Sequence, residues 1–141
     1  MTFTLHPRLA ADTLALGDFP LCRLLLMNDA QYPWFILVPR RENAREIYQL
    51  EPRDQQLLLR ESSALSRAAM DAFKGDKLNV AALGNLVPQL HLHHVVRYAH
   101  DPAWPRPVWG LHPARPYAEP ERVARLATLR AHLPDDFAWA E

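Results

Sequence analysis

Three of the chain's seven histidines, His91, His93 and His94, fall within four positions of one another, in the stretch 89–96 that reads QLHLHHVV. An imidazole can attack an electrophile, move protons near neutral pH or bind a metal ion. Two histidines at positions i and i+2 of a strand are also a spacing at which both can bind one metal. The residue types therefore allow nucleophilic, proton-transfer or metal chemistry at this point of the chain.

The alternation of polar and aliphatic residues over this stretch predicts a β-strand. Successive side chains of a strand point to opposite faces, so Gln89, His91 and His93 are expected to share one face. The two leucines between them then point into a core. His94 breaks the alternation and is predicted on the leucine side, at a bulge or at the strand end. We therefore expect a row of polar side chains on an accessible face, backed by aliphatic packing.

The stretch resembles the motif of the histidine triad (HIT) superfamily of nucleotide-binding hydrolases and transferases. That motif is His-φ-His-φ-His-φ-φ, where φ is hydrophobic, usually with Gly-Gln or Gly-Asn four or five residues upstream; here Gly84-Asn85 precedes it. Two positions depart from the motif, since Gln89 replaces the first histidine and His94 replaces an aliphatic residue. The resemblance covers roughly the first three quarters of the chain.

The resemblance implies a catalytic role for each motif position. His91 would attack the α-phosphorus of a nucleotide and form a covalent nucleotidyl-imidazole, which is then hydrolysed or passed to an acceptor. His93 would donate a hydrogen bond to a phosphoryl oxygen or to the leaving group. The backbone carbonyl at the first motif position orients the nucleophile, and Gln89 retains that carbonyl while lacking a side chain that can titrate.

The resemblance also implies a nucleotide pocket, a purine nucleoside monophosphate as the bound group, and a homodimer without cofactor or metal. Asn28 would bind the ribose, and Asn85 a phosphate or ribose oxygen. Asn79 is a weaker candidate for the same pocket. Each has an ordinary alternative, since asparagine favours turns and Asn79 could bond within the sheet.

Three functions remain open from the residues. The first is a nucleotide hydrolase or nucleotidyl transferase acting through His91. The second is a nucleotide-binding or sensing protein with the same pocket and little or no turnover, because Gln89 cannot share a proton. The third, a metal site on His91 and His93, is the weakest, because no acidic residue stands at a companion spacing.

Length, charge and cysteine content narrow the class. The 141 residues suit one domain with a sizeable core. Sixteen basic and sixteen acidic residues give no net charge, so neither nucleic acid nor an anionic membrane is expected as a partner. The single cysteine, Cys22, excludes an internal disulfide and is expected to be buried in a strand. No apolar stretch is long enough to span a bilayer and the start lacks the pattern of an export signal, so a cytoplasmic protein is expected.

The remaining patterns predict an α+β fold in a single domain over residues 1–141. Apolar runs at 21–27 and 34–38 predict an antiparallel hairpin, with Trp34 or Phe35 as a candidate wall for a base. The pattern after Glu51-Pro52 predicts one long helix ending near Gly75 as a cap, followed by a strand over 77–84. Residues 9–16 are expected to form a short helix or irregular cover.

The C-terminal part of the chain is predicted to add an arm and a helix to this core. The core should span about 1–110 and hold a mainly antiparallel sheet of about five strands. A proline-rich arm and a final helix occupy 98–141, and Trp104 and Trp109 in the arm are expected to pack on the same subunit or on a second one.

Overall fold

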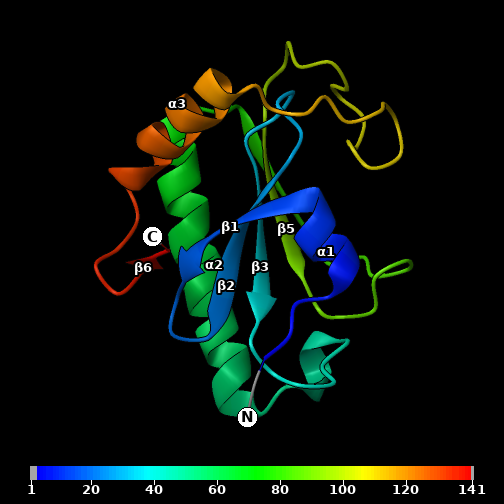
Figure 1. The fold of residues 1–141 in the computed structure, drawn as a ribbon, viewed down its shortest axis with the longest axis vertical. Coiled ribbons are helices and arrows are strands. Elements are labelled where there is room, and N and C mark those ends of the chain that lie inside the picture. The colour runs from blue at the N-terminus through cyan, green and yellow to red at the C-terminus, as the bar shows by residue number, and fades with distance from the viewer. Residues whose placement is uncertain (1–2, 141) are drawn as a thin grey trace.

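A six-stranded antiparallel sheet organises the molecule, in the order β4-β5-β3-β2-β1-β6. A computed structural model describes residues 3–140 (Figure 1). Within them the strands are β1 (Thr13–Asp18), β2 (Cys22–Met27), β3 (Trp34–Pro39), β4 (Lys77–Ala81), β5 (Leu92–Arg97) and β6 (Ala138–Trp139). The helices are α1 (Pro7–Asp12), η1 (Ile47–Gln49, a 3-10 turn), α2 (Pro52–Phe73) and α3 (Glu119–Arg130).

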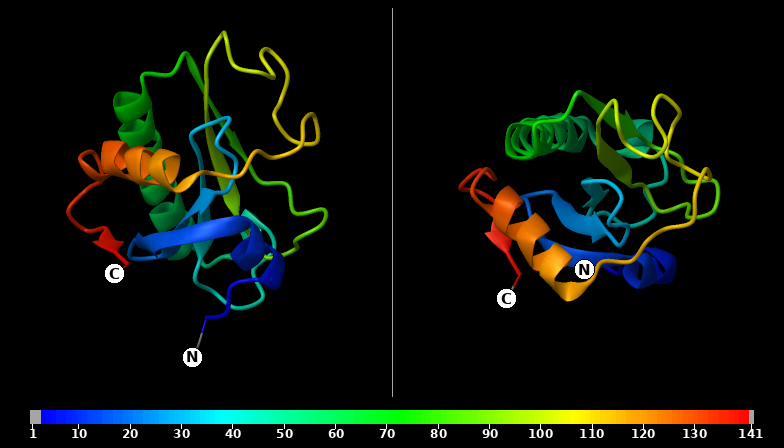
Figure 2. Two further views of the ribbon diagram at one scale, coloured as in Figure 1. Left: turned by 45° about the horizontal axis from the view of Figure 1, so that its top comes forward. Right: turned by 90° about the horizontal axis from the view of Figure 1, so that it is seen from above.

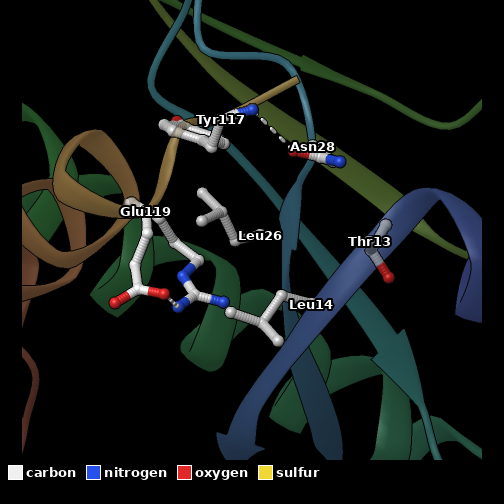
Figure 3. Close-up of a pocket in the computed structure, with 7 residues that line it drawn as sticks. Thr13, Leu14, Leu26, Asn28, Tyr117 and Glu119 are labelled. Carbon is white, nitrogen blue, oxygen red and sulfur yellow. Dashed lines mark hydrogen bonds and ion pairs between the residues drawn. The ribbon is translucent and has the colours of Figure 1, made fainter.

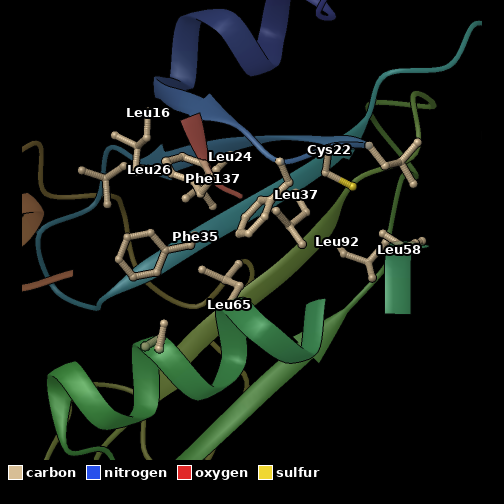
Figure 4. Close-up of a cluster of buried hydrophobic side chains, with 14 of the residues drawn as sticks. Leu16, Cys22, Leu24, Leu26, Phe35, Leu37, Leu58, Leu65, Leu92 and Phe137 are labelled. Carbon is tan, nitrogen blue, oxygen red and sulfur yellow. The ribbon is translucent and has the colours of Figure 1, made fainter. Parts of the chain in front are cut away.

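Helix α2 covers one face of the sheet. Pro52 occupies its first turn, where a missing N–H costs nothing, and Asp54 adds a favourable charge at the positive end of the helix dipole. The apolar face of the helix meets strands β2, β3 and β5 in one core cluster, part of which Figure 4 shows. Leu65 of this helix is fully buried, and such a side chain contributes about 1.5–3 kcal/mol on burial.

The opposite face of the sheet is covered by different parts of the chain. A second core cluster joins Leu9 of α1, Ile36 and Val38 of β3, and Ala103 and Val108 of the arm. Helix α1 and the arm before α3 therefore lie on the side of the sheet away from α2, as the view from above shows (Figure 2). The predicted α+β architecture with a long helix is confirmed, and the two faces of the sheet are closed by unrelated segments.

The sequence-based description was incomplete at the sheet edge. It gave about five strands, whereas the described residues contain six, because β1 and the two-residue β6 were not predicted. Strand β1 is poor in β-branched residues and forms by pairing with β2. Gly17 in β1 has φ +153°, and a Cβ there would collide with the backbone oxygen of Ala138, so only glycine lets β6 approach.

The end of α2 also differs from the prediction. Lys74, not Gly75, takes the left-handed conformation that closes the helix, with φ 53° and ψ 45°. Gly75 is required for another reason: a Cβ there would collide with the side chain of Val96 in β5. The glycine thus serves the packing of the helix end against β5, the strand that carries His93 and His94.

Candidate functional site

A pocket of about 310 Å³ lies on the sheet face opposite α2. Its walls come from α1, the end of β2, the middle of β3, the loop before β5, the histidine motif and the arm. The lining residues are Arg8, Leu9, Asp12, Met27, Ile36, Leu83, Gly84, Asn85, Leu86, Val87, His91, His93, Trp109 and Gly110. A volume of this size suits a small-molecule ligand, for which pockets span roughly 300–1,000 Å³.

His91 has one ring nitrogen fixed by the backbone and one without a partner. It precedes β5 directly, and its Nδ1 lies 2.7 Å from the carbonyl oxygen of Gln89. A carbonyl can only accept, so Nδ1 carries the proton and Nε2 keeps its lone pair. No hydrogen bond to His91 Nε2 occurs among residues 3–140. Only 6% of the residue is exposed, but it lines the pocket, so a ring nitrogen without a partner belongs to a residue of the pocket wall.

His93 also has its Nδ1 hydrogen-bonded, but the partner is a donor instead of an acceptor. The indole N–H of Trp34 donates to His93 Nδ1 at 3.0 Å, so in the neutral ring the proton resides on Nε2. The imidazole lies among the rings of His91, Trp34 and Trp109, with centroid distances of 4.9, 5.7 and 5.4 Å. Burial, and to a smaller extent His91 and His94, lowers the pKa of His93 to about 3. At neutral pH this side chain is a hydrogen-bond donor.

His94 faces the other way, as its break in the alternation predicted. It is fully buried against α2, where the Ser62 hydroxyl lies 2.8 Å from Nε2 and the Leu92 carbonyl 3.1 Å from Nδ1. The carbonyl fixes the proton on Nδ1, so Nε2 accepts from Ser62. Burial lowers the pKa of His94 to about 4, although the bond to Leu92 raises it. Both nitrogens are used inside the protein, so His94 is a packing residue.

Gln89 keeps its predicted backbone role, but its side chain does not join the row of histidines. Its carbonyl orients His91, while its amide group accepts from the N–H of His6 at 2.8 Å and donates to the oxygen of Thr4 at 3.0 Å. The strand begins only at Leu92, so residue 89 is outside the pleat and can turn away. Its side chain therefore holds the segment that leads into α1.

Of the three predicted asparagines, the structure brings only Asn85 to the histidine pocket. Asn79 accepts from the buried Arg97 at 2.9 Å, within the sheet. Asn28 accepts from the N–H of Tyr117 at 2.9 Å and lines a second cavity beside α3, which Figure 3 shows. Asn28 and Asn79 thus lie outside the lining of the histidine pocket, each bonded to another part of the chain, and their ribose and pocket roles stay predictions.

The wall formed by α1 was missed by the sequence analysis. Arg8, Leu9 and Asp12 line the pocket, and Arg8 Nε lies 3.4 Å from the Asp12 carboxylate. No local signal connects residues 8–12 with residues 91–93. Trp109 was expected on its own subunit or on a second one, and it lies against the body beside His93. Trp104 lies over the guanidinium of Arg97, at 5.7 Å.

Two features that residues 3–140 lack bear on the class of site. No group of three or more His, Cys, Asp or Glu side chains there is arranged to hold a metal ion. None of the helices in that part of the chain combines the length and apolarity needed to cross a bilayer. The pocket is thus described by its two histidines, its apolar walls and a few polar groups at its edge.

The geometry agrees with the family that the sequence resembles. A model of the HIT domain matches residues 8–100, and the chain therefore belongs to the HIT domain family. No match was found among curated proteins.

Solved structures of histidine triad proteins extend the match over nearly the whole chain. One from Marinobacter aquaeolei is 59% identical, with a TM-score of 0.91 over 94% of this chain and 97% of its own. One from Bradyrhizobium japonicum is 46% identical, with a TM-score of 0.92 over 95% of this chain and 100% of its own. A third, from Sinorhizobium meliloti, is 42% identical, with a TM-score of 0.91 over 94% and 98%.

Proposed function

We propose that this protein binds a nucleotide and hydrolyses it, or transfers its nucleotidyl group, at the α-phosphate through a covalent bond to His91. The observation that supports this most strongly is the state of His91, a residue that lines the pocket: Nδ1 is held by the Gln89 carbonyl at 2.7 Å, and Nε2 has no hydrogen-bond partner among residues 3–140. A neutral imidazole oriented in this way is an effective nucleophile toward phosphorus.

The proposed reaction has two displacements. In the first, His91 Nε2 forms a bond to the α-phosphorus, and the bond from phosphorus to the leaving group breaks with its electron pair going to that group. His93 Nε2–H donates a hydrogen bond to an oxygen on which charge develops. In the second, water or another acceptor attacks the phosphorus and the P–N bond breaks with its electron pair returning to His91 Nε2; water gives the nucleoside monophosphate, and another acceptor leaves carrying the nucleotidyl group. The proton lost by the attacking water goes to solvent.

The pocket has parts suited to each portion of a nucleotide. Leu9, Met27 and Leu86 offer apolar surface for a base, with purine the expected one. Arg8 and Asn85 are the polar groups that would meet ribose or phosphate oxygens. Asn28 and Asn79 lie outside this lining and are further candidates for contact with the nucleotide. These assignments rest on lining positions and on the family resemblance.

The same resemblance leads us to propose a homodimer working in the cytoplasm. Strand β4 is at the edge of the sheet, and Val80, Leu83 and Leu86, in this strand and the loop after it, are 48, 49 and 79% exposed. Apolar groups beside an unpaired strand edge favour association with a second chain. Light scattering coupled to size exclusion measures the mass directly, and a monomer at micromolar concentration would contradict the proposal.

The test is turnover with a trapped intermediate. Purified protein is incubated with diadenosine polyphosphate or an adenosine phosphoramidate, and products are separated by chromatography. We expect AMP as a product, and an AMP adduct on the peptide that contains His91 after rapid quenching. His91→Ala should abolish both, whereas His112→Ala, an exposed histidine outside the pocket, should change neither.

A binding or sensing protein is the second candidate, and one observation favours it. The Gln89 amide, which replaces a titratable group, is occupied by Thr4 and His6 and cannot assist a leaving group. AMP binding by calorimetry, with neither product nor adduct on any substrate, would support this candidate over catalysis.

A further inference from the structure

The bond between Trp34 and His93 has a consequence for which substrates the site accepts. We propose that Trp34 is a positioning residue that fixes His93 as a neutral hydrogen-bond donor, and that the site therefore takes nucleotides whose leaving group departs as a phosphate-type anion and not as an amine. The inference rests on the proposed function and specifies the substrate class for that site.

The geometry of this bond leaves one assignment. Trp34 begins β3, on the pocket side of the sheet, while Ile36 of the same strand pairs with His93. Its Nε1 lies 3.0 Å from His93 Nδ1, and Trp34 is only 5% exposed. An indole N–H can donate but never accept. Nδ1 must therefore be the unprotonated nitrogen of His93.

The same bond opposes the charged form of His93. A second proton on Nδ1 would set two N–H donors against each other at a contact where Trp34 and His93 are each only 5% exposed. The lowered pKa of His93 has the same direction, with burial as its main cause. His93 thus carries one proton, on Nε2, and can donate a hydrogen bond through it without acting as a general acid.

The other groups around His93 do not supply an acid. On β5, His94 is neutral and bound to Ser62, and just before that strand His91 has its N–H directed at the Gln89 carbonyl. Across the pocket, α1 contributes Arg8 and Asp12, paired at 3.4 Å. A guanidinium does not release its proton in proteins, and an ionised carboxylate can only accept. From β3 and the arm come Ile36, Trp34, Trp109 and Gly110, none of which titrates.

Because no group around His93 is an acid, two classes of leaving group should behave differently in this site. An amine departing from phosphorus needs a proton as the P–N bond breaks, because the amide anion is a very strong base. A phosphate-type oxygen leaves as a stable anion: the P–O bond breaks, the electron pair stays on oxygen, and His93 Nε2–H stabilises it by a hydrogen bond while keeping its proton. The site supplies what the second class needs and lacks what the first requires.

The tautomer is tested by NMR on the full-length protein, without any substrate. Long-range ¹H–¹⁵N correlations in ¹⁵N-labelled protein should show His93 protonated on Nε2 alone and not titrating between pH 5 and 8. Trp34→Phe keeps an aromatic ring but removes the donor, and should raise the pKa of His93 and populate the second tautomer. Trp109→Phe is the matched control, since that indole touches the same ring without bonding to it. A wild-type His93 protonated on Nδ1, or titrating near its ordinary pKa, would overturn the assignment.

The substrate class is tested by competition. We expect kcat/KM for diadenosine tetraphosphate to exceed that for adenosine 5′-phosphoramidate at least ten-fold at pH 7.5. In Trp34→Phe, the ratio of the two kcat/KM values should become smaller when the pH is lowered below 6.5, because His93 can then act as a proton donor. Equal or reversed preference in the wild type would refute the substrate class. Absence of turnover on both would refute the proposed function, while the NMR result would still decide the tautomer.

Discussion

Histidines lie on both faces of the sheet at β5 and just before it, but they have different roles on the two faces. On the α2 face, His94 uses both ring nitrogens inside the protein, with Ser62 and the Leu92 carbonyl. On the pocket face, His91 and His93 each use Nδ1 alone, with the Gln89 carbonyl and the Trp34 indole as partners. All three are buried to a similar degree, with 0, 6 and 5% exposure respectively. Burial therefore does not distinguish the structural histidine from the candidate functional pair.

The difference lies in the nitrogen that is left over. A buried histidine whose two nitrogens are satisfied contributes packing and a hydrogen bond between elements. A buried histidine with one nitrogen open to a cavity has chemistry to offer. On the pocket face the two partners are of opposite kind, an acceptor for His91 and a donor for His93, so the pair presents one lone pair and one N–H. That combination suits attack on phosphorus with stabilisation of a departing oxygen.

The largest expected effect separates the two faces by activity. His91→Asn should lower turnover by more than about a thousand-fold, since the covalent route is lost. Its effect on the free energy of unfolding should stay below about 1 kcal/mol, the contribution of one hydrogen bond. Steady-state kinetics and urea unfolding measure the two. Retained turnover in His91→Asn would break the comparison.

The next effect separates the faces by stability. His94→Ala should lower the free energy of unfolding by roughly 2–4 kcal/mol, because it opens a cavity and leaves the Ser62 hydroxyl unpaired. In the double variant His94→Ala/Ser62→Ala the loss should be smaller than the sum of the two single losses, as expected for contacting residues. Turnover of the folded fraction should change only a few-fold, and a loss as deep as that of His91→Asn would contradict the structural role.

Acid should affect stability through both faces. The folded-state pKa values of His93 and His94 are lowered to about 3 and about 4, below the ordinary value near 6.5. Below pH 6.5 the unfolded chain binds these protons and the folded chain does not. The stability is therefore complete above pH 6.5 and falls as the pH drops toward 4, by up to about 1.4 kcal/mol per pH unit for each group.

Urea unfolding between pH 7 and 5 measures this slope. His94→Asn should remove part of it, whereas His112→Ala, an exposed histidine, should leave it unchanged. A slope in His94→Asn equal to that of the wild type would show that His94 is not the group responsible.

The smallest effect sharpens the comparison at Gln89, which supports the pocket face from outside. Gln89→Ala removes two hydrogen bonds to the N-terminal segment, which are worth about 0.5–1.5 kcal/mol each. Amide exchange at His6 should accelerate, and affinity for nucleotide should fall a few-fold as α1 loosens. Gln56→Ala, in an exposed position of α2, is the control. Unchanged exchange at His6 would show that the segment is held by other contacts.

The parts of this structure that the sequence predicted are those set by local patterns. Alternation placed Leu90, Leu92 and His94 on the core side, and all three are buried there. Proline at a helix start and apolar spacing gave α2 almost to the residue. The motif itself pointed to His91 and His93 together, because an i, i+2 pair on a strand shares a face by geometry alone.

The contacts that the sequence did not predict join residues that lie far apart along the chain. Gln89 bonds to residues 83 and 85 positions away, Asn28 to one 89 positions away, and Trp34 to one 59 positions away. Strand β6 exists only where it pairs with β1. No periodicity or capping signal encodes such contacts. They follow from tertiary packing, and they decided which of the predicted polar residues reach the pocket.

The placement of the four tryptophans should allow intrinsic fluorescence to report whether the pocket is occupied. Trp34 and Trp109 lie around His93, with their rings 6.0 Å apart, whereas Trp104 and Trp139 lie over the arginines 97 and 130. Indole emission responds to nearby charge and to exclusion of solvent. Filling of the cavity should therefore change the intrinsic fluorescence of the unmodified protein, and the signal should vanish when Trp34 and Trp109 are both replaced by phenylalanine.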